Sequence, residues 1–286
     1  MANVGIVADD LTGGTTVGAL IAREGVPATV FFDPSYVATT PLPDNAAAIV
    51  STDSRPLSAG VAFGRVRDAT RILEEQGARM FAKRIDTTVR GGVGPEVEGM
   101  LSALGSEYMA VVVPAMPQSR RVVIEGYSLI DSVLLTRTGV AQDVRTPVHQ
   151  AHLPTLFREQ FKAGLGHVSI RPVISGRQAI KYELVELRRE GTRIFLVDAL
   201  SIDDVDQIAQ AGIVKTHGSW DGFPVRAMRI TDDGEHWEVM SLAHDAHAAQ
   251  ERGMRRVEAG VYSTLVAPHE ALTTFTLLSM PSWPQG

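Results

Sequence analysis

The sequence predicts an α/β fold built on an open, mostly parallel sheet with helices on both faces. Short apolar runs alternate with helix-length segments over residues 3–211, which is the pattern of a parallel sheet covered by helices. Several of these runs end in polar, glycine-rich stretches that lead into the next helix. Ligand-binding loops of open α/β sheets lie at this position, so the pattern also predicts a binding edge.

The predicted strands are apolar runs rich in Val, Ile, Ala and Phe. They cover residues 3–8, 28–32, 47–51, 80–84, 109–114, 168–171 and 193–198. The predicted helices cover residues 15–24, 57–76, 95–104, 153–163, 176–190 and 203–211. Pro95 and Glu96 suit a first helical turn, where a missing N–H costs nothing and an acid meets the positive dipole end. Residues 122–152 break the alternation and are predicted to form hairpins or a long loop at a sheet edge.

A boundary is predicted at residues 217–224, where glycine, serine, aspartate and proline cluster. It separates an α/β domain at residues 1–216 from a small hairpin–helix extension at residues 217–286. In the extension, residues 225–230 and 236–240 would pair across the turn signal Asp233-Gly234. Residues 243–259 would then form a helix.

Composition excludes several classes of site. The 286 residues include no cysteine, which excludes disulfides, thiol catalysis and Cys-ligated metals. A net charge of −6 argues against broad nucleic-acid binding. No apolar run reaches the roughly 20 residues of a membrane helix, and the start of the chain lacks the basic region of a signal peptide. We therefore expect a cytoplasmic protein that binds neither nucleic acid nor membranes.

The first polar strand end is the most informative. The predicted strand at residues 3–8 leads into Asp9 and Asp10, then Thr12 and Gly13, before a helix begins. Glycine allows a ligand to approach the backbone, and a helix N-terminus offers N–H groups to an anion. The carboxylates could bind sugar hydroxyls or abstract a proton from one. A simple helix cap is the alternative interpretation, although paired acids exceed what a cap requires.

Three further strand ends carry polar groups. Asp53 and Arg55 follow the strand at residues 47–51, where an Asx-type turn is the alternative. Residues 83–96 place charged side chains beside glycines and a helix N-terminus, a setting suited to a carboxylate or phosphate. Residues 114–121 carry two prolines that would stiffen the loop. The charged, glycine and amide residues singled out in these last two stretches are Lys83, Asp86, Arg90, Gly91, Gln118 and Arg121.

Other catalytic and cofactor signals are weak. The sequence holds no G-x-x-x-x-G-K-[ST] phosphate loop and no G-x-G-x-x-G after a strand. His244 and His247 stand three residues apart on a predicted helix, a spacing that can chelate a metal. We interpret them as a solvated helix face and predict no metal site.

Together the four strand-end motifs resemble the N-terminal domain of the four-carbon acid sugar kinases, which include threonate, erythronate and 3-oxo-tetronate kinases. The matching stretches are residues 8–13, 53–55, 83–96 and 114–121, and the resemblance covers residues 3–215. Residues 135–147 also match a family loop that bears threonine, aspartate and proline. The resemblance implies a Rossmann-like domain that binds a small sugar acid and a C-terminal domain that binds ATP. The hydroxyl would be phosphorylated between them.

The resemblance extends to individual residues. We predict Asp9, Asp10 and Asp86 as catalytic, and Thr12, Gly13, Asp53, Arg55, Lys83, Arg90, Gly91, Gln118 and Arg121 as substrate-binding. An arginine would hold the carboxylate of the acid, and an aspartate would orient or deprotonate the attacking hydroxyl. Three positions depart from the family pattern: Thr16, Gly92 and Arg120 stand where the family has aspartate, asparagine and glycine.

The roughly 60 residues beyond the predicted boundary are too few for a nucleotide-binding domain of usual size. Phosphorylation would therefore need ATP, Mg²⁺ and either a nucleotide-binding partner chain or an improvised nucleotide site. The alternatives are a non-catalytic sugar-acid-binding or sensor domain, and a lyase, isomerase or hydrolase that uses the same cleft. A scaffold role would leave the polar strand ends unexplained. Exposed sheet edges would suit a homodimer.

Overall fold

The computed structural model describes residues 4–43, 45–106 and 108–214. It also describes the strands at residues 219–220, 223–230, 237–242, 255–258, 261–266 and 277–278. The chain divides into two compact units, Met1–Val205 and Asp206–Gly286. Within the described residues, no helix has both the length and the apolar character needed to cross a membrane.

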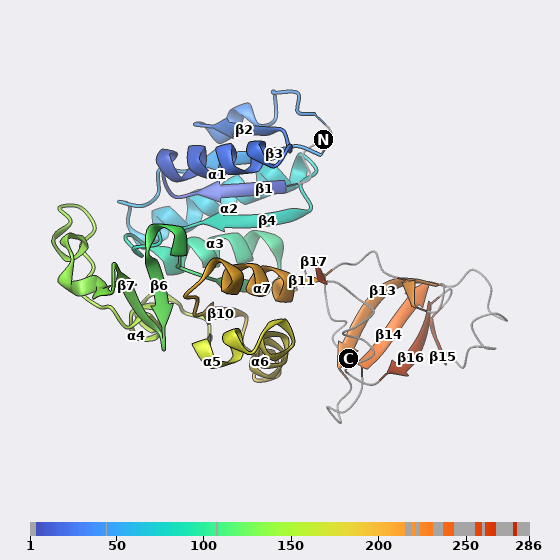
Figure 1. Cartoon of the computed structure of the whole chain (residues 1–286). Coiled ribbons are helices and arrows are strands. Elements are labelled where there is room, and N and C mark those ends of the chain that lie inside the picture. Colours follow the sequence, from blue (N-terminus) through green and yellow to red (C-terminus); the bar gives the residue numbers. More distant parts are fainter. Residues whose placement is uncertain are drawn as a thin grey trace. The chain divides into compact units, whose positions relative to one another are not determined.

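The first unit begins with a four-stranded parallel sheet. Its strands are β1 (Val4–Ala8), β2 (Ala28–Phe31), β3 (Ala47–Ser51) and β4 (Met80–Arg84), in the order β2-β3-β1-β4. The helices α1 (Leu11–Arg23), α2 (Ala59–Glu75) and α3 (Val93–Leu104) follow β1, β3 and β4. Figure 1 shows the four strands side by side with α1, α2 and α3 packed along them.

Helices cover both faces of this sheet because successive side chains of a strand point to opposite faces. Ile6 of β1 and Ile49 of β3 are buried together with the apolar side of α1. Val7 and Val50, one position along, are buried with Leu73 of α2. The continuous apolar runs of β1 and β3 therefore reflect strands that are buried on two sides, and the predicted α/β class is confirmed.

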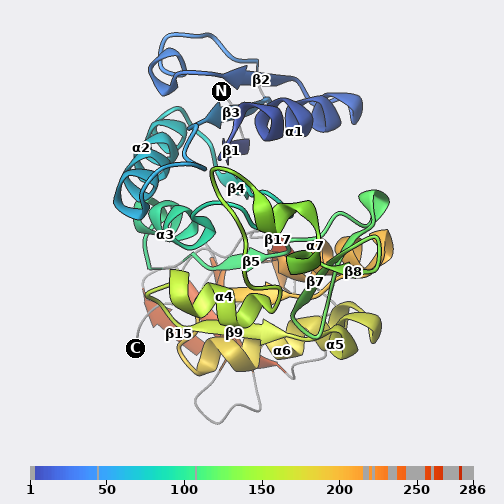
Figure 2. The same ribbon diagram turned by 90° about the vertical axis from the view of Figure 1, so that its left-hand side faces the viewer.

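A second parallel sheet lies in the same unit. Its strands are β5 (Ala110–Val112), β9 (Leu165–Val168) and β10 (Ile194–Val197), in the order β5-β10-β9. The helices near it are α4 (Leu153–Gln160), α5 (Ile170–Ile174), α6 (Arg177–Arg189) and the start of α7 (Ile202–Gly212), as Figure 2 shows. Phe157 of α4 and Val97 of α3 pack with Ile194 and Leu196 in its core.

The parallel strands thus form two sheets where the sequence predicts one. β4 pairs with β1 alone among the described strands, and its first four residues alternate between exposed and partly buried. This alternation is typical of a strand with one covered face. β5 has three residues and pairs with β10.

The predicted insertion at residues 122–152 is confirmed as a hairpin region. β6 (Arg121–Ile124), β7 (Tyr127–Ile130) and β8 (Val133–Leu134) form an antiparallel sheet. The short helices η3 (Leu135–Arg137) and η4 (Gly139–Gln142) follow it. A bridge between Val123 and Ala199 connects β6 to the chain just after β10.

One strand prediction in the first unit is displaced. The sequence predicts a strand at residues 168–171, but β9 ends at Val168 and Ile170 begins α5. Pro172 explains the difference, because it has no N–H for a sheet ladder yet is tolerated in the first turn of a helix. Gly166 and His167 interrupt the apolar run of β9 and hide it from a search for such runs.

In the second unit, β13 (Phe223–Ile230) pairs with β14 (Trp237–Leu242), which confirms the predicted strand pair. The turn signal Asp233-Gly234 lies outside the described residues. The predicted helix at 243–259 is wrong for Arg255–Glu258, which form β15 and pair with β16 (Val261–Val266). This is a case of strand pairing overriding local helical preference. Residues 243–254 lie outside the described residues, as do His244 and His247 within them.

Lys181 of α6 is the basis of a stability prediction. It is 4% exposed and has no ion-pair partner within the described chain. Burial, and then the positive charge of Arg177, lower its pKa to about 8. We expect Lys181→Met to raise the free energy of unfolding by about 1–3 kcal/mol at pH 7, because it removes an unpaired buried charge.

The advantage of Lys181→Met should shrink between pH 8 and about 10.5. Over this range the unfolded lysine keeps its proton and the folded one does not, so wild-type stability rises with pH. Urea unfolding at pH 7 and pH 10 measures both effects. The exposed Lys162 provides the control, since Lys162→Met should change stability by less than about 0.5 kcal/mol. A destabilised Lys181→Met would contradict the prediction.

Candidate functional site

Three of the four predicted polar strand ends meet at one edge of the first sheet. In the parallel register, Ala8 of β1 lies beside Ser51 of β3 and Arg84 of β4. The segments that begin at Asp9, Thr52 and Ile85 therefore leave the sheet together. This is the carboxyl edge, where ligands bind in open α/β sheets.

Asp9 and Asp10 hold the guanidinium group of Arg55 between them. Arg55 Nε donates to Asp9 Oδ2 at 2.6 Å, and its Nη1 lies 2.8 Å from Asp10 Oδ2. Asp10 also caps α1, because its Oδ1 accepts from the backbone N–H of Gly13 at 2.7 Å. Burial opposes the charge on Arg55, but the hydrogen bond and charge of Asp9 raise its pKa above the ordinary value. Arg55 thus stays charged as the link between two strand ends.

One carboxylate oxygen of Asp9 has no hydrogen-bond partner among the described residues. The side chain is 3% exposed, and the oxygen without a partner is Oδ1. Arg84 Nη1 lies 3.9 Å from it. A buried carboxylate oxygen without a donor is costly, and such an atom marks a position where a ligand or water can donate.

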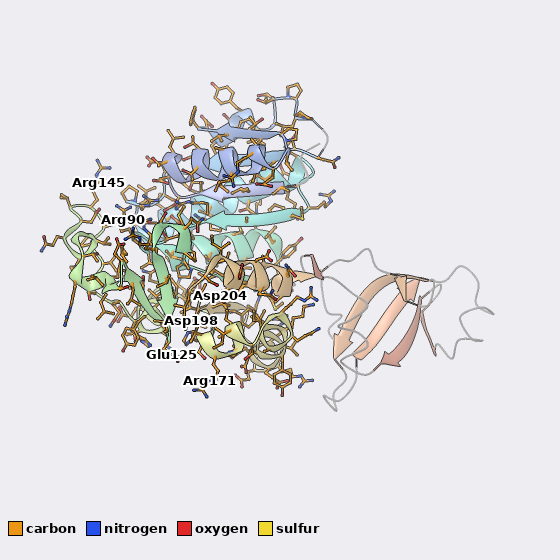
Figure 3. All side chains as sticks on the ribbon, viewed as in Figure 1. Arg90, Glu125, Arg145, Arg171, Asp198 and Asp204 are labelled. Atoms are coloured by element: carbon orange, nitrogen blue, oxygen red, sulfur yellow. The ribbon has the colours of Figure 1, made fainter. Side chains whose placement is uncertain are left out.

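Asp86 organises the turn that follows β4. Its Oδ2 accepts from Thr88 Oγ1 and from Arg90 Nε, both at 2.6 Å. Burial would raise the pKa of Asp86, but the hydrogen bonds from Arg90 and Thr88 outweigh it and lower the pKa. Arg90 Nη1 also reaches Asp143 Oδ2 at 3.1 Å. Figure 3 shows Arg90 beside the loop that bears Arg145, whose backbone N–H also donates to Asp143.

The turn after β4 is conformationally unusual. Val89 has φ 51° although it is β-branched and only 1% exposed, which makes it an outlier for its residue type. Gly91 has φ +81°, and an added Cβ would lie 2.6 Å from the carbonyl oxygen of Arg55. Glycine at position 91 therefore lets the turn pass directly over Arg55. Strained backbone of this kind gathers at functional sites.

Lys83 lies in a buried polar network below the site. Its Nζ is 2.8 Å from Glu96 Oε2 and donates to the carbonyl oxygen of Arg84 at 2.9 Å. Glu96 Oε1 accepts from Ser54 Oγ at 2.6 Å, and Ser54 Oγ bonds to Thr52 Oγ1 at 2.8 Å. The network connects β3, β4 and α3, so Lys83 already has partners within the protein.

The remaining predicted residues are less closely joined to this cluster. Arg121, at the start of β6, donates from Nη1 to Thr87 Oγ1 at 2.9 Å, which brings the fourth motif to the turn after β4. Thr12, Asp53 and Gln118 are exposed, and their side chains form no hydrogen bond with the described chain.

Sequence reasoning gave no functional role to three side chains of the cluster. Arg84 lies at the last position of β4. Its place directly after Lys83, at the end of a predicted strand, could have indicated a site residue. Glu96 appeared to be only an acid in a first helical turn. Asp143 lies 53 residues from Arg90 along the chain, and only the family loop pointed to it.

Comparisons with known proteins place the chain in a family. The family model described as the sugar-binding N-terminal domain matches residues 4–221. The chain belongs to the four-carbon acid sugar kinase family. It is 39% identical over 212 residues to the D-erythronate kinase of Heliobacterium modesticaldum, which covers 73% of this chain and 48% of that kinase. It is 30% identical to the 3-oxo-tetronate kinase of Actinobacillus succinogenes, with 73% and 50% covered.

Among solved structures, the chain resembles a domain from Bordetella bronchiseptica with a TM-score of 0.62 and 29% identity. The match covers 72% of this chain and 49% of that one, which was solved with bound citrate as a domain-swapped dimer. The chain thus spans about half the length of the curated four-carbon acid sugar kinases that it matches.

Gly91→Ala tests the packing of the turn over Arg55. We expect a loss of about 3 kcal/mol or more in the free energy of unfolding, because strain at positive φ adds to a backbone clash. Gly25→Ala is the matched control: Gly25 has φ +82° but open space around its Cβ position. It should lose only about 1–2 kcal/mol. Equal losses in urea unfolding would show that the close contact with Arg55 carries no energy.

Glu96→Gln tests the buried network. It leaves the Lys83 ammonium without its charged partner, so we expect destabilisation of about 3–5 kcal/mol. Asp68→Asn breaks the exposed Arg67–Asp68 pair and should cost less than about 1 kcal/mol. Chemical denaturation of both variants gives the comparison, and similar small losses would contradict a structural role for the network.

Proposed function

We propose that this chain binds a four-carbon sugar acid at the carboxyl edge of β1, β3 and β4. In the whole enzyme, a hydroxyl of that acid would be phosphorylated from ATP. The observation that carries the proposal is the unpartnered, buried Oδ1 of Asp9 within a cluster of arginines. A hydroxyl group can donate to this oxygen, and an arginine can bind a carboxylate. A sugar acid supplies both groups.

The three aspartates predicted as catalytic differ in what they can still bind. Both oxygens of Asp10 are engaged, by Gly13 and Arg55. Both oxygens of Asp86 accept hydrogen bonds from Thr88 or Arg90, and its pKa is lowered, which makes it a weak base. Asp9 is the one of the three with a free oxygen, so we assign it the contact with a substrate hydroxyl.

The relatives support the substrate class. Their names describe kinases of D-erythronate and 3-oxo-tetronate. The Bordetella bronchiseptica domain was solved with citrate, which is itself a hydroxy acid. Citrate combines a hydroxyl group with carboxylates, and this is the chemistry that we propose for the ligand of this chain.

The described residues do not fit ATP or Mg²⁺. They contain no group of three or more acidic or histidine side chains that could hold a metal ion, and the sequence has no phosphate loop. We therefore assign the nucleotide and the metal to no residue of the described chain. In this proposal they are bound by another segment or by a partner chain.

Calorimetric titration of the purified chain with D-erythronate and 3-oxo-tetronate tests the binding. Asp9→Asn should weaken binding by about 10-fold or more, as expected for a lost hydrogen bond to a charged group. Asp131→Asn, in an exposed pair with Arg120, should leave affinity unchanged. Melting curves of both variants establish that they fold.

A transfer assay with labelled ATP, with and without Mg²⁺, separates the kinase from its alternatives. Binding without transfer by this chain alone supports a sugar-acid-binding half. Transfer by the chain alone contradicts our assignment of the nucleotide to another segment. Consumption of the acid without ATP would identify a non-kinase enzyme, and failure of every acid to bind would overturn the proposal.

A further inference from the structure

The arginines of the site differ in how far their charge is already neutralised. Arg55 contacts the carboxylates of Asp9 and Asp10, and Arg90 contacts those of Asp86 and Asp143. Neither has much positive charge left to offer an acid. The free charge must therefore be sought elsewhere in the cluster.

Arg84 is one arginine of the cluster whose charge is less fully neutralised. Its Nη1 donates to the carbonyl oxygen of Ile85. The nearest carboxylate oxygen is Asp9 Oδ1 at 3.9 Å, which is beyond hydrogen-bond distance. A guanidinium group has five N–H donors, so most donors of Arg84 have no partner in the described chain. Its side chain is 25% exposed, which leaves it accessible to a small ligand.

Gly13 shows that the position of Arg84 depends on close packing. A Cβ added at Gly13 would lie 2.7 Å from Arg84 Nε and 2.8 Å from its Cδ. The side chain of Arg84 therefore lies against the first turn of α1, and a larger residue at position 13 would displace it. The positive end of that helix dipole adds to the charge of Arg84, and an anion would be favoured there.

Arg84 lacks acceptors and Asp9 lacks a donor, so a ligand that offers both can bind to the two residues together. Arg84 has spare donors, and Asp9 Oδ1 is a buried acceptor without a donor. The two lie 3.9 Å apart, too far to satisfy each other. A carboxylate and a hydroxyl on adjacent carbons place an acceptor beside a donor, so one such end of a ligand can bridge the gap.

We propose that Arg84 and Asp9 together recognise the 2-hydroxycarboxylate end of the substrate. Arg84 binds the carboxylate, and Asp9 Oδ1 accepts a hydrogen bond from the hydroxyl on the neighbouring carbon. Gly13 is the positioning residue that makes room for Arg84. This inference rests on the proposed function. It adds which arginine binds the carboxylate and which hydroxyl group donates to Asp9.

The test uses Arg84→Gln and three ligands: D-erythronate, its carboxamide and its 2-deoxy analogue. In the wild type, removal of the 2-hydroxyl should weaken binding by about 10-fold or more. Arg84→Gln should weaken the binding of D-erythronate by about 10-fold or more. It should change the affinity for the uncharged amide by less than 2-fold. A loss confined to the charged ligand shows direct contact, because general damage to the site would weaken both.

Arg79→Gln is the matched control. Arg79 precedes β4 at the opposite end of the strand, and its Nη1 likewise donates to a neighbouring carbonyl oxygen, that of Ala78. It should bind all three ligands as the wild type does. Arg84→Lys provides a second variant that keeps the charge, and its loss of affinity for D-erythronate should be smaller than that of Arg84→Gln.

Two results would overturn the inference while the proposed function stands. If Arg84→Gln weakened the binding of the acid and of the amide equally, Arg84 would not contact the carboxylate. If the wild type bound D-erythronate and its 2-deoxy analogue equally tightly, Asp9 would not accept a hydrogen bond from that hydroxyl. Absence of wild-type binding to any four-carbon acid would instead overturn the proposed function itself.

Discussion

The guanidinium group of Arg55 is the interaction on which the site depends. It faces Asp9 after β1 and Asp10 at the start of α1, while its own backbone lies beneath Gly91. Without this cation, two carboxylates would face each other at a partly buried edge, and like charges at short range are unfavourable. Arg55 therefore joins the segments that follow β1 and β3, and it lies against the turn that follows β4.

Arg90 is a second cation that joins two segments of the chain through carboxylates. It joins the turn after β4 to Asp143, which follows β8 within the insertion at residues 122–152. Hydrogen bonds from the backbone N–H groups of Thr146 and Arg145, and then from Arg90, lower the pKa of Asp143 to about 2. Asp143 stays ionised until the pH falls toward that value, so this link between the insertion and the site persists at neutral and mildly acidic pH.

Much of the first unit could be predicted from sequence because its local signals agree with the fold. β1 and β3 are continuous apolar runs because both faces of the strands are covered. The strand ends carried the polar residues that meet at the carboxyl edge. β9 escaped notice because Gly166 and His167 break its pattern, and β15 because its partner β16 decides its conformation.

The sequence could not reveal which charges in the site are free. Lys83, Arg55 and Arg90 all have the residue type expected for binding an acid, yet each is held by a carboxylate of the protein. Pairing of this kind depends on which side chains the register brings together, so it is invisible in a motif. Arg84 differs from them only through geometry, because it lies close to a carboxylate but does not reach it.

This distribution of charge has a consequence for affinity. An arginine that is already paired must break an internal hydrogen bond to bind a substrate, and the exchange yields little net free energy. A spare donor beside an unsatisfied acceptor breaks no hydrogen bond within the protein on binding, because the ligand satisfies groups that the folded chain leaves open. The paired arginines therefore shape and rigidify the edge. The selectivity of the site for an acid must come from the few groups whose hydrogen bonds are incomplete without one.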